Sequence, residues 1–497
     1  MDRIVNLLCK PDWGKRAYAV FALCATTAIG LPAQTLTTLY SFCSQSGCPD
    51  GASPLAGLTQ GSNGDLYGTT QSDGVNCANC GTIFKITPSG SLSTLYSFCS
   101  ESGCADGFDP AAVLVQGIDG AFYGTTYGGG TIDEGTVFKI TPSGKLTTLY
   151  SFCSQNGCDD GENPNAGLVQ ATNGDFYGTT EAGGNGWGTI FKITQSGTLT
   201  TVHSFCAQSM CADGGRPVAG LVQGIDGDLY GTTGYGGANY ACPNGCGWVF
   251  KITPSGTLTT LHSFAGYPTE GYTPCTALVQ GIDGDFYGTT LGGASGAPKG
   301  AGTVFKITPS GTLTTLYSFC SQIFCPDGAE PLGGLVQGTD GSFYGTTFRG
   351  AYGGGTIFKI IPSGTLTTLY RFCTQSGCAD GAKSAATLIQ DTNGDFYGAT
   401  SAGGANFKGT VFSLSVGLGP FVKMQPTSGE AGAIIKILGT DLTGATSVSF
   451  DGTEAAFRVV SNSLIMTMVP AGASSGKLQV VTPGGTLVSN VAFRVGP

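Results

Sequence analysis

The tetrapeptide Tyr67-Gly68-Thr69-Thr70 recurs along most of the chain and decides the predicted fold. It returns every 53 to 57 residues, and the last copy replaces one Thr with Ala. A period of this length that contains only strand-like segments is typical of β-propeller blades rather than of a helical solenoid. The seven copies begin at Tyr67, Tyr123, Tyr177, Tyr230, Tyr287, Tyr344 and Tyr397.

Each repeat contains four strand-like segments around the tetrapeptide, which we call A to D in chain order. In the first repeat they cover residues 56–60, 65–70, 82–87 and 92–98, and they are rich in β-branched and aromatic residues. Asn63-Gly64 separates A from B, and Thr87-Pro88-Ser89-Gly90 separates C from D. Both sequences favour tight turns, so each repeat is predicted to form one small sheet.

The two ends of the repeat array are incomplete in complementary ways. Residues 36–42 form a lone D-like segment, whereas the last repeat has A, B and C segments at 386–390, 395–400 and 410–415 but no D. A circular array can join these fragments into one blade and leave no open sheet edge. We therefore expect an all-β fold, a seven-bladed β-propeller closed by its N-terminal strand.

The repeat resembles a known family. Besides Tyr-Gly-Thr-Thr it contains Gly-Thr-Val-Phe-Lys-Ile-Thr-Pro-Ser-Gly at 135–144 and Leu-Thr-Thr-Leu-Tyr-Ser-Phe at 36–42. Over about residues 35–415 the chain resembles the GloVer tandem repeat of exported, choice-of-anchor bacterial proteins. The resemblance implies export and a variable C-terminal module, and it brings no catalytic residues.

The remaining residues are similar to an IPT/TIG immunoglobulin-like domain, with Pro426-Thr427-Ser428-Gly429 near the start and Thr482-Pro483-Gly484-Gly485 near the end. Their strand spacing independently suits a small β-sandwich. The similarity implies a role in spacing or protein interaction. The expected domains are a signal peptide at 1–33, the propeller at 34–416 and the immunoglobulin-like domain at 419–497.

Export is also predicted from the first residues and from composition. Lys10, Lys15 and Arg16 precede an apolar stretch at 17–31 and the small-residue exit Leu31-Pro32-Ala33, as in a signal peptide. Nineteen cysteines suit an oxidising compartment. A net charge of −10 with only 22 Lys and Arg argues against nucleic-acid binding. We expect a secreted or cell-surface monomer with no membrane span after cleavage.

The cysteines come in short-range pairs, most of them as Cys-x4-Cys directly after segment D. A zinc site would need four ligands from different repeats, and the chain has only two histidines, so export and even pairing favour disulfides. Cys275 is left over, and its role stays open. No metal or cofactor is predicted. The predicted pairs are Cys43 with Cys48, Cys77 with Cys80, Cys99 with Cys104, Cys153 with Cys158, Cys206 with Cys211, Cys242 with Cys246, Cys320 with Cys325, and Cys373 with Cys378.

An acidic residue followed by Gly comes after each cysteine loop. Two interpretations are open: a ring of ligand or cation contacts, or Asp-Gly turn chemistry that recurs because the turn recurs. Nothing in the sequence supports a bound cation. The candidate ligand contacts are Asp50, Asp106, Asp160, Asp213, Asp327 and Asp380.

The loops between segments B and C vary among repeats, unlike the short A–B and C–D turns, and variable loops on a rigid scaffold commonly carry recognition. Five of their aromatic residues are predicted to form a contact surface, although the rings could instead fold back onto neighbouring repeats. They are Trp187, Tyr235, Tyr240, Phe348 and Tyr352.

We expect a binding or adhesion protein that recognises a glycan or a surface protein through the face bearing the B–C and D–A loops. The histidines, His203 and His262, stand where other repeats have Tyr in segment D, which favours a packing role over catalysis. A carbohydrate-active enzyme with a carboxylate pair and a structural spacer remain as alternatives.

Overall fold

The computed structural model describes residues 34–496, apart from 209–210, 238–241, 243, 268, 294–300 and 351–352. The predicted signal peptide, residues 1–33, lies outside the described residues.

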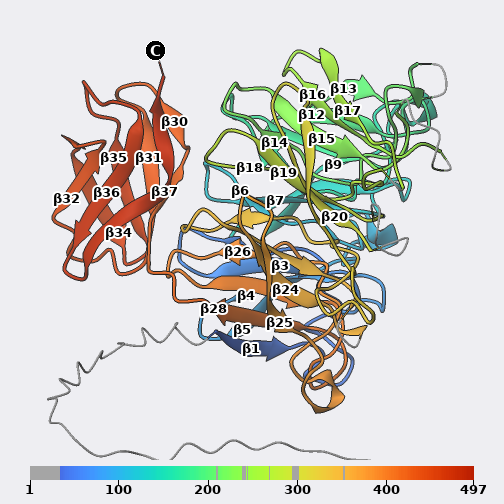
Figure 1. The fold of residues 1–497 in the computed structure, drawn as a ribbon, viewed down its shortest axis with the longest axis horizontal. Coiled ribbons are helices and arrows are strands. Elements are labelled where there is room, and N and C mark those ends of the chain that lie inside the picture. Colours follow the sequence, from blue (N-terminus) through green and yellow to red (C-terminus); the bar gives the residue numbers. More distant parts are fainter. Residues whose placement is uncertain are drawn as a thin grey trace, which may run out of the picture. The chain divides into compact units, whose positions relative to one another are not determined.

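The repeats fold into seven four-stranded antiparallel sheets, called sheets 1 to 7 below (Figure 1). Sheets 1 to 3 contain β2 (Thr59–Gln60), β3 (Leu66–Thr70), β4 (Thr82–Ile86) and β5 (Leu92–Ser97); β6 (Val115–Gln116), β7 (Phe122–Thr126), β8 (Thr136–Ile140) and β9 (Leu146–Ser151); and β10 (Val169–Gln170), β11 (Phe176–Thr180), β12 (Thr189–Ile193) and β13 (Leu199–Ser204).

Sheets 4 to 6 repeat this order. They contain β14 (Val222–Gln223), β15 (Leu229–Thr233), β16 (Trp248–Ile252) and β17 (Leu258–Ser263); β18 (Val279–Gln280), β19 (Phe286–Thr290), β20 (Thr303–Ile307) and β21 (Leu313–Ser318); and β22 (Val336–Gln337), β23 (Phe343–Thr347), β24 (Thr356–Ile360) and β25 (Leu366–Arg371). Among the cysteine loops that are described completely, three contain one turn of 3-10 helix, η1 (Ser102–Cys104), η2 (Asn156–Cys158) and η5 (Ser376–Cys378).

Sheet 7 combines strands from both ends of the repeat array. It consists of β26 (Ile389–Gln390), β27 (Phe396–Thr400), β28 (Thr410–Ser415) and β1 (Thr35–Ser41), and β1 pairs antiparallel with β28. Sheet 7 also contacts sheet 1, because the Ser53 amide donates to the Lys408 carbonyl at 2.9 Å. An equivalent hydrogen bond joins sheets 2 and 3, where the Asn163 amide donates to the Glu134 carbonyl at 2.9 Å.

The recurring tetrapeptide forms the B strand, which is buried on both faces. The Tyr67 ring stacks on Phe122 of the next sheet with centroids 4.0 Å apart, and Tyr123 stacks on Phe176 in the same way at 4.1 Å. Gly68 leaves room for this packing, since a Cβ there would lie 2.6 Å from the Phe84 ring. The repeated residues therefore supply the aromatic contacts that hold neighbouring sheets together.

The A strands are shorter than the sequence predicts, since β2 contains only Thr59 and Gln60 of the expected 56–60. The residues before each A strand direct their backbone groups to the neighbouring sheet instead of to the ladder. In sheet 2, the Ala112 carbonyl accepts a hydrogen bond from the Thr69 hydroxyl of sheet 1 at 3.3 Å. The residues before the A strand therefore contribute to contacts between sheets.

The C-terminal residues form two further sheets around a separate apolar core that includes Ile437, Phe450 and Phe493. Their order is β29-β31-β35-β34 and β30-β37-β36-β32-β33. The strands are β29 (Lys423–Gln425), β30 (Ser428–Gly429), β31 (Ile434–Leu438), β32 (Ser447–Phe450), β33 (Thr453–Glu454), β34 (Phe457–Ser461), β35 (Leu464–Met468), β36 (Gly476–Thr482) and β37 (Gly485–Val495). This arrangement is the β-sandwich that the strand spacing predicts.

Candidate functional site

The B–C loops, the D–A connections and the cysteine loops lie together on one face of the sheets, which we call the loop face. An isolated bridge joins each D–A connection to the following B–C loop, as between Phe108 and Gly128 and between Gly215 and Tyr235. The cysteine loops join the same face, because the Gly130 amide donates to the Cys104 carbonyl at 3.0 Å. All variable segments of the repeats therefore share one surface.

Eight disulfides close loops on this face. Cys275 is the free cysteine of the described residues, and burial raises the pKa of its half-buried thiol to about 12, so the thiol stays protonated at neutral pH. The bonds join Cys43 and Cys48, Cys77 and Cys80, Cys99 and Cys104, Cys153 and Cys158, Cys206 and Cys211, Cys242 and Cys246, Cys320 and Cys325, and Cys373 and Cys378.

The acidic residues after the cysteine loops are bound within the chain. The buried Asp106 carboxylate accepts hydrogen bonds from the Tyr96 hydroxyl at 2.8 Å, from the Ser100 amide at 2.9 Å and from the Glu101 amide at 3.2 Å. A carboxylate with several amide and hydroxyl donors holds its loop shut. Equivalent contacts hold Asp50, Asp160, Asp327 and Asp380, and Asp213 accepts amides from its own loop. Contact of these carboxylates with an external ligand stays a prediction.

The two histidines occupy the position of that tyrosine. His262 Nε2 lies 2.9 Å from a Glu270 carboxylate oxygen, and His203 Nε2 lies 3.6 Å from Asp213. Burial lowers the pKa of His203. Burial alone would raise the pKa of Glu270, but the hydrogen bonds from His262 and the Ala265 amide outweigh it and lower that pKa. His262 therefore takes the loop-closing role that tyrosine has elsewhere, whereas His203 occupies the same position without forming the hydrogen bond.

A second repeated set of residues on the loop face was not foreseen. Seven non-glycine residues have φ between 52° and 58°, at the same position of each repeat. The backbone contacts there recur: the Arg216 amide donates to the Trp187 carbonyl at 2.7 Å, and the Arg216 carbonyl accepts from the Gly234 amide at 3.1 Å. We call these residues the left-handed ring: Ser53, Asp109, Asn163, Arg216, Thr273, Glu330 and Lys383.

The left-handed ring combines a repeated backbone with side chains of different chemistry. A left-handed conformation costs a non-glycine residue roughly 1 kcal/mol, and such strain concentrates at functional positions. Several members contact the first residue of the preceding B–C loop. Gln71 donates to Asp109 at 3.4 Å, and the Lys383 ammonium lies 5.9 Å from the centre of the Phe348 ring. The ring thus presents a different polar or charged group between each pair of sheets.

The loop face is hollowed where sheets 2, 3 and 4 meet. The pocket has a volume of about 310 Å³. Two of its aromatic residues, Trp187 and Tyr235, were predicted as contact residues, and the third, Tyr127, was not. The lining residues are Tyr127, Asn163, Glu181, Ala182, Gly186, Trp187, Arg216, Tyr235 and Asn244.

The polar groups of the pocket are fixed by one another and by the rings. Arg216 forms an ion pair with Glu181, and its guanidinium lies 5.2 Å from the centre of the Tyr235 ring. The Asn163 side chain donates to the Tyr127 carbonyl at 3.2 Å. The pocket therefore combines aromatic side chains with polar groups, several of which already pair with one another.

Two known families match the chain, one over the repeats and one over the C-terminal residues. The Gloeobacter/Verrucomicrobia repeat matches residues 26–159, 153–337 and 298–444. The chain belongs to this repeat family. The IPT/TIG domain matches residues 421–495, so both resemblances drawn from the sequence are confirmed. Together the Gloeobacter/Verrucomicrobia repeat and the IPT/TIG domain fit an extracellular adhesion-type protein.

Two solved enzyme structures match this member of the repeat family at low identity. A fungal alcohol oxidase in complex with copper is 13% identical with a TM-score of 0.48, over 93% of this chain and 99% of that chain. The periplasmic gluconolactonase of Pseudomonas aeruginosa is 16% identical with a TM-score of 0.42, over 64% of this chain and 84% of that chain. At these scores neither likeness carries an argument about this chain. No curated protein matches it.

The remaining predicted contact residues of this repeat-family member lie elsewhere or are not described. Phe348 is half-buried on the loop face, away from the pocket, and Tyr240 and Tyr352 lie outside the described residues. Trp187 is also half-buried, because one side packs against the apolar core of sheets 3 and 4. Within the residues that the structure describes, no helix has the length and apolar character needed to cross a membrane.

Sequence reasoning missed Tyr127, Asn163, Glu181, Arg216 and Asn244. One signal was present: the residue at this position changes its chemistry in every repeat, and in six of the seven repeats it precedes Pro, as in Asn163-Pro164 and Arg216-Pro217. A residue before Pro is expected to be extended, so nothing local pointed to a left-handed turn facing a pocket.

Proposed function

We propose that this chain is an exported binding protein that recognises a glycan in the pocket between sheets 2, 3 and 4. The observation that carries the proposal is the grouping of Tyr127, Trp187 and Tyr235 with paired polar groups in one cavity of the loop face. Aromatic faces stack on the apolar face of a sugar ring, and the neighbouring amides and charges can bind its hydroxyl groups.

We also infer that the seven sheets form a seven-bladed propeller closed by β1. Pairing of β1 with β28 and the bond from Ser53 to Lys408 support this arrangement. A further bond runs from the Gln60 side chain to the Thr392 hydroxyl at 2.8 Å, between the A–B regions of sheets 1 and 7. Closure provides a rigid frame on which the loop face can hold a preformed pocket.

Export and the domain limits belong to the same proposal. Eight disulfides fit an oxidising compartment, as expected for a secreted or surface protein with a signal peptide at 1–33. The propeller at 34–416 would supply recognition. The immunoglobulin-like domain at 419–497 would supply spacing or a protein contact. We expect the mature protein to be a monomer.

The pocket does not support the alternative of a two-carboxylate enzyme. Among its lining residues Glu181 is the one carboxylate, and it forms an ion pair with Arg216. Glycoside hydrolysis of the usual kind needs two carboxyl groups on opposite sides of the scissile bond. The carboxyl groups of Glu134 and Glu162 interact, and burial together with the Glu134 charge raises the pKa of Glu162, but neither residue lines the pocket.

A glycan array tests the proposal with the full chain and a matched set of variants. Truncating an aromatic anchor commonly costs more than 1.4 kcal/mol, so Trp187→Ala and Tyr127→Ala should each weaken binding at least about tenfold. Phe324→Ala is the control, because Phe324 is 87% exposed on the cysteine loop after β21 and does not line the pocket.

Three outcomes are informative. Loss of binding in the pocket variants but not in Phe324→Ala supports the proposal. Equal binding by all four proteins places recognition elsewhere on the chain. Binding of a surface protein in place of any glycan, with the same dependence on Trp187, would keep the pocket and replace the ligand class.

A further inference from the structure

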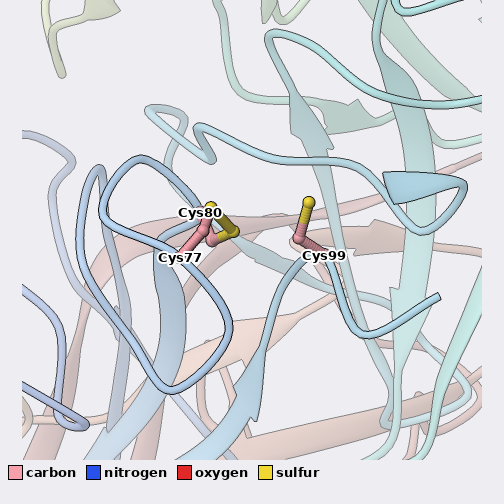
Figure 2. Close-up of side chains that lie close together, drawn as sticks. All are labelled: Cys77, Cys80 and Cys99. Atoms are coloured by element: carbon pink, nitrogen blue, oxygen red, sulfur yellow. A yellow bond between two sulfur atoms is a disulfide. The ribbon is translucent and has the colours of Figure 1, made fainter. Parts of the chain in front are cut away.

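Two disulfides of sheet 1 lie next to each other on the loop face. The sulfur atoms of Cys77, Cys80 and Cys99 all lie within 4.8 Å of one another. Figure 2 shows the Cys77–Cys80 disulfide beside the Cys99 side chain. Cys77 is bonded to Cys80, and Cys99 is bonded to Cys104. Cys77 is exposed, whereas Cys80 is fully buried. An exposed cysteine, a buried cysteine and a second disulfide thus form one cluster.

Several contacts hold the cluster together. The Asn76 side chain, next to Cys77, donates to the Phe98 carbonyl at 2.8 Å, directly before Cys99. The Phe98 amide donates to the Gly81 carbonyl at 3.1 Å, directly after Cys80. Cys80 and Cys99 also share one apolar cluster. The two disulfides are therefore fixed against each other by the contacts of sheet 1 with its loops.

Sheet 4 has the first of these two disulfides but lacks the second. Cys242–Cys246 occupies the place of Cys77–Cys80, and the Phe264 amide donates to the Gly247 carbonyl at 3.0 Å, as Phe98 does to Gly81. Ala265 follows Phe264 where Cys99 follows Phe98. The chain thus provides an internal control in which the first disulfide has no second disulfide beside it.

We propose that Cys77, Cys80, Cys99 and Cys104 form a thiol–disulfide exchange site that reacts with an external dithiol. A thiolate displaces one sulfur of a disulfide when it can reach that bond, so access and proximity decide which exchange occurs. Cys77 is the sulfur that a reductant reaches, and Cys80 is the sulfur that passes the exchange to Cys99.

The exchange has three steps. The first thiolate of the dithiol bonds to Cys77, and the Cys77–Cys80 bond breaks to release the Cys80 thiolate. Cys80 then bonds to Cys99, and the Cys99–Cys104 bond breaks to release Cys104. The second thiol of the reagent displaces Cys77. The dithiol loses two electrons and becomes a disulfide, its two protons end on Cys77 and Cys104, and the chain keeps one new bond, Cys80–Cys99.

The new bond would join the B–C loop of sheet 1 to the next cysteine loop. Both segments belong to the loop face, so the exchange converts two local loop closures into one covalent link between different elements. Reduction in the compartment of this protein would then change the loop face without unfolding the sheets.

Tryptic mapping can detect the exchange directly. Each of the eight native disulfides joins two cysteines of one tryptic peptide, whereas Cys80 and Cys99 lie on opposite sides of the Lys85 cleavage site. The full chain is treated under native conditions with one equivalent of dithiothreitol, alkylated with N-ethylmaleimide and digested. We expect peptide 86–139 joined to the peptide that ends at Lys85, with Cys77 and Cys104 alkylated.

The controls separate exchange from simple reduction. The double variant Cys99→Ala, Cys104→Ser reproduces the arrangement at Ala265, and it should lose the joined peptide while Cys77 and Cys80 are still alkylated. Cys242–Cys246 should yield only its two alkylated cysteines, and an unlabelled Cys153–Cys158 shows that the chain stays folded. Alkylated Cys77 and Cys80 with an intact Cys99–Cys104 bond in the native chain would overturn the proposal.

Discussion

The loops after β9 and β17 are both closed by a carboxylate, but the groups that bind the two carboxylates differ. After β9, Asp160 accepts from the Tyr150 hydroxyl at 2.7 Å, and a disulfide joins Cys153 to Cys158. After β17, Glu270 binds His262 and the Ala265 amide, and the two cysteines are absent. The second loop is shorter, and the longer Glu side chain compensates. The carboxylate is kept in both loops, so it is the essential closure and the disulfide is an addition to it.

Removing the carboxylate should have the largest effect. Asp160→Ala removes the buried carboxylate that accepts from the Tyr150 hydroxyl and from the amides of Ser154 and Gln155. Each hydrogen bond to a charged group contributes about 1 kcal/mol or more, so we expect the free energy of unfolding to fall by about 3 kcal/mol. Urea denaturation measures it. Asp159→Ala, a neighbouring exposed position, is the control, and an equal effect at both sites would contradict the interpretation.

Removing the disulfide should cost less. In the chain-entropy model a loop of this length contributes about 2 kcal/mol, so the double variant Cys153→Ser, Cys158→Ser should remain folded, with unfolding shifted by that amount. The loop after β17 shows that the carboxylate alone can hold the closure. Complete unfolding of the double variant in buffer would show that the disulfide, and not Asp160, is the essential closure.

The stability contributed by the loop after β17 should depend on pH. His262 and the Ala265 amide lower the pKa of Glu270, so folding is favoured by the ionised carboxylate. That stabilisation is present above the ordinary Glu pKa of about 4.3 and is lost as the pH falls through the lowered pKa. Glu270→Gln should therefore reduce stability by about 1 kcal/mol at pH 7 and by less at pH 3. Urea midpoints that differ equally at both pH values would refute this assignment.

The smallest effect should come from restoring the common residue in sheet 3. His203 Nε2 lies 3.6 Å from Asp213, beyond hydrogen-bond distance, and it has no hydrogen-bond partner in the structure. A tyrosine hydroxyl reaches the corresponding carboxylate at 2.7 to 2.9 Å in other repeats. His203→Tyr should raise the free energy of unfolding by roughly 0.5–1 kcal/mol. A lower thermal midpoint for the variant would show that this site has adapted to histidine.

These loops contain features that sequence can predict and features that it cannot. Cys153 and Cys158 lie within one short loop, so their pairing was readable from spacing alone. The hydrogen bonds of Asp160 were not, because the same Asp-Gly sequence permits an external ligand as well as a loop closure. Only the burial of the carboxylate and its contacts distinguish the two, and both depend on the packing of the loop against its own sheet.

The sequence by itself determined the family, the repeated sheets, the turns between strands and the local disulfides, because each of these follows from residues close together in one period. Tertiary structure alone decided the pocket, since Tyr127, Trp187 and Tyr235 come from three different sheets. It also decided the left-handed ring, where contacts across sheets overcome the preference of a residue before proline for an extended backbone. The strands, turns and cysteine pairs recur with the repeat period, whereas the pocket forms where repeats with different loop residues meet.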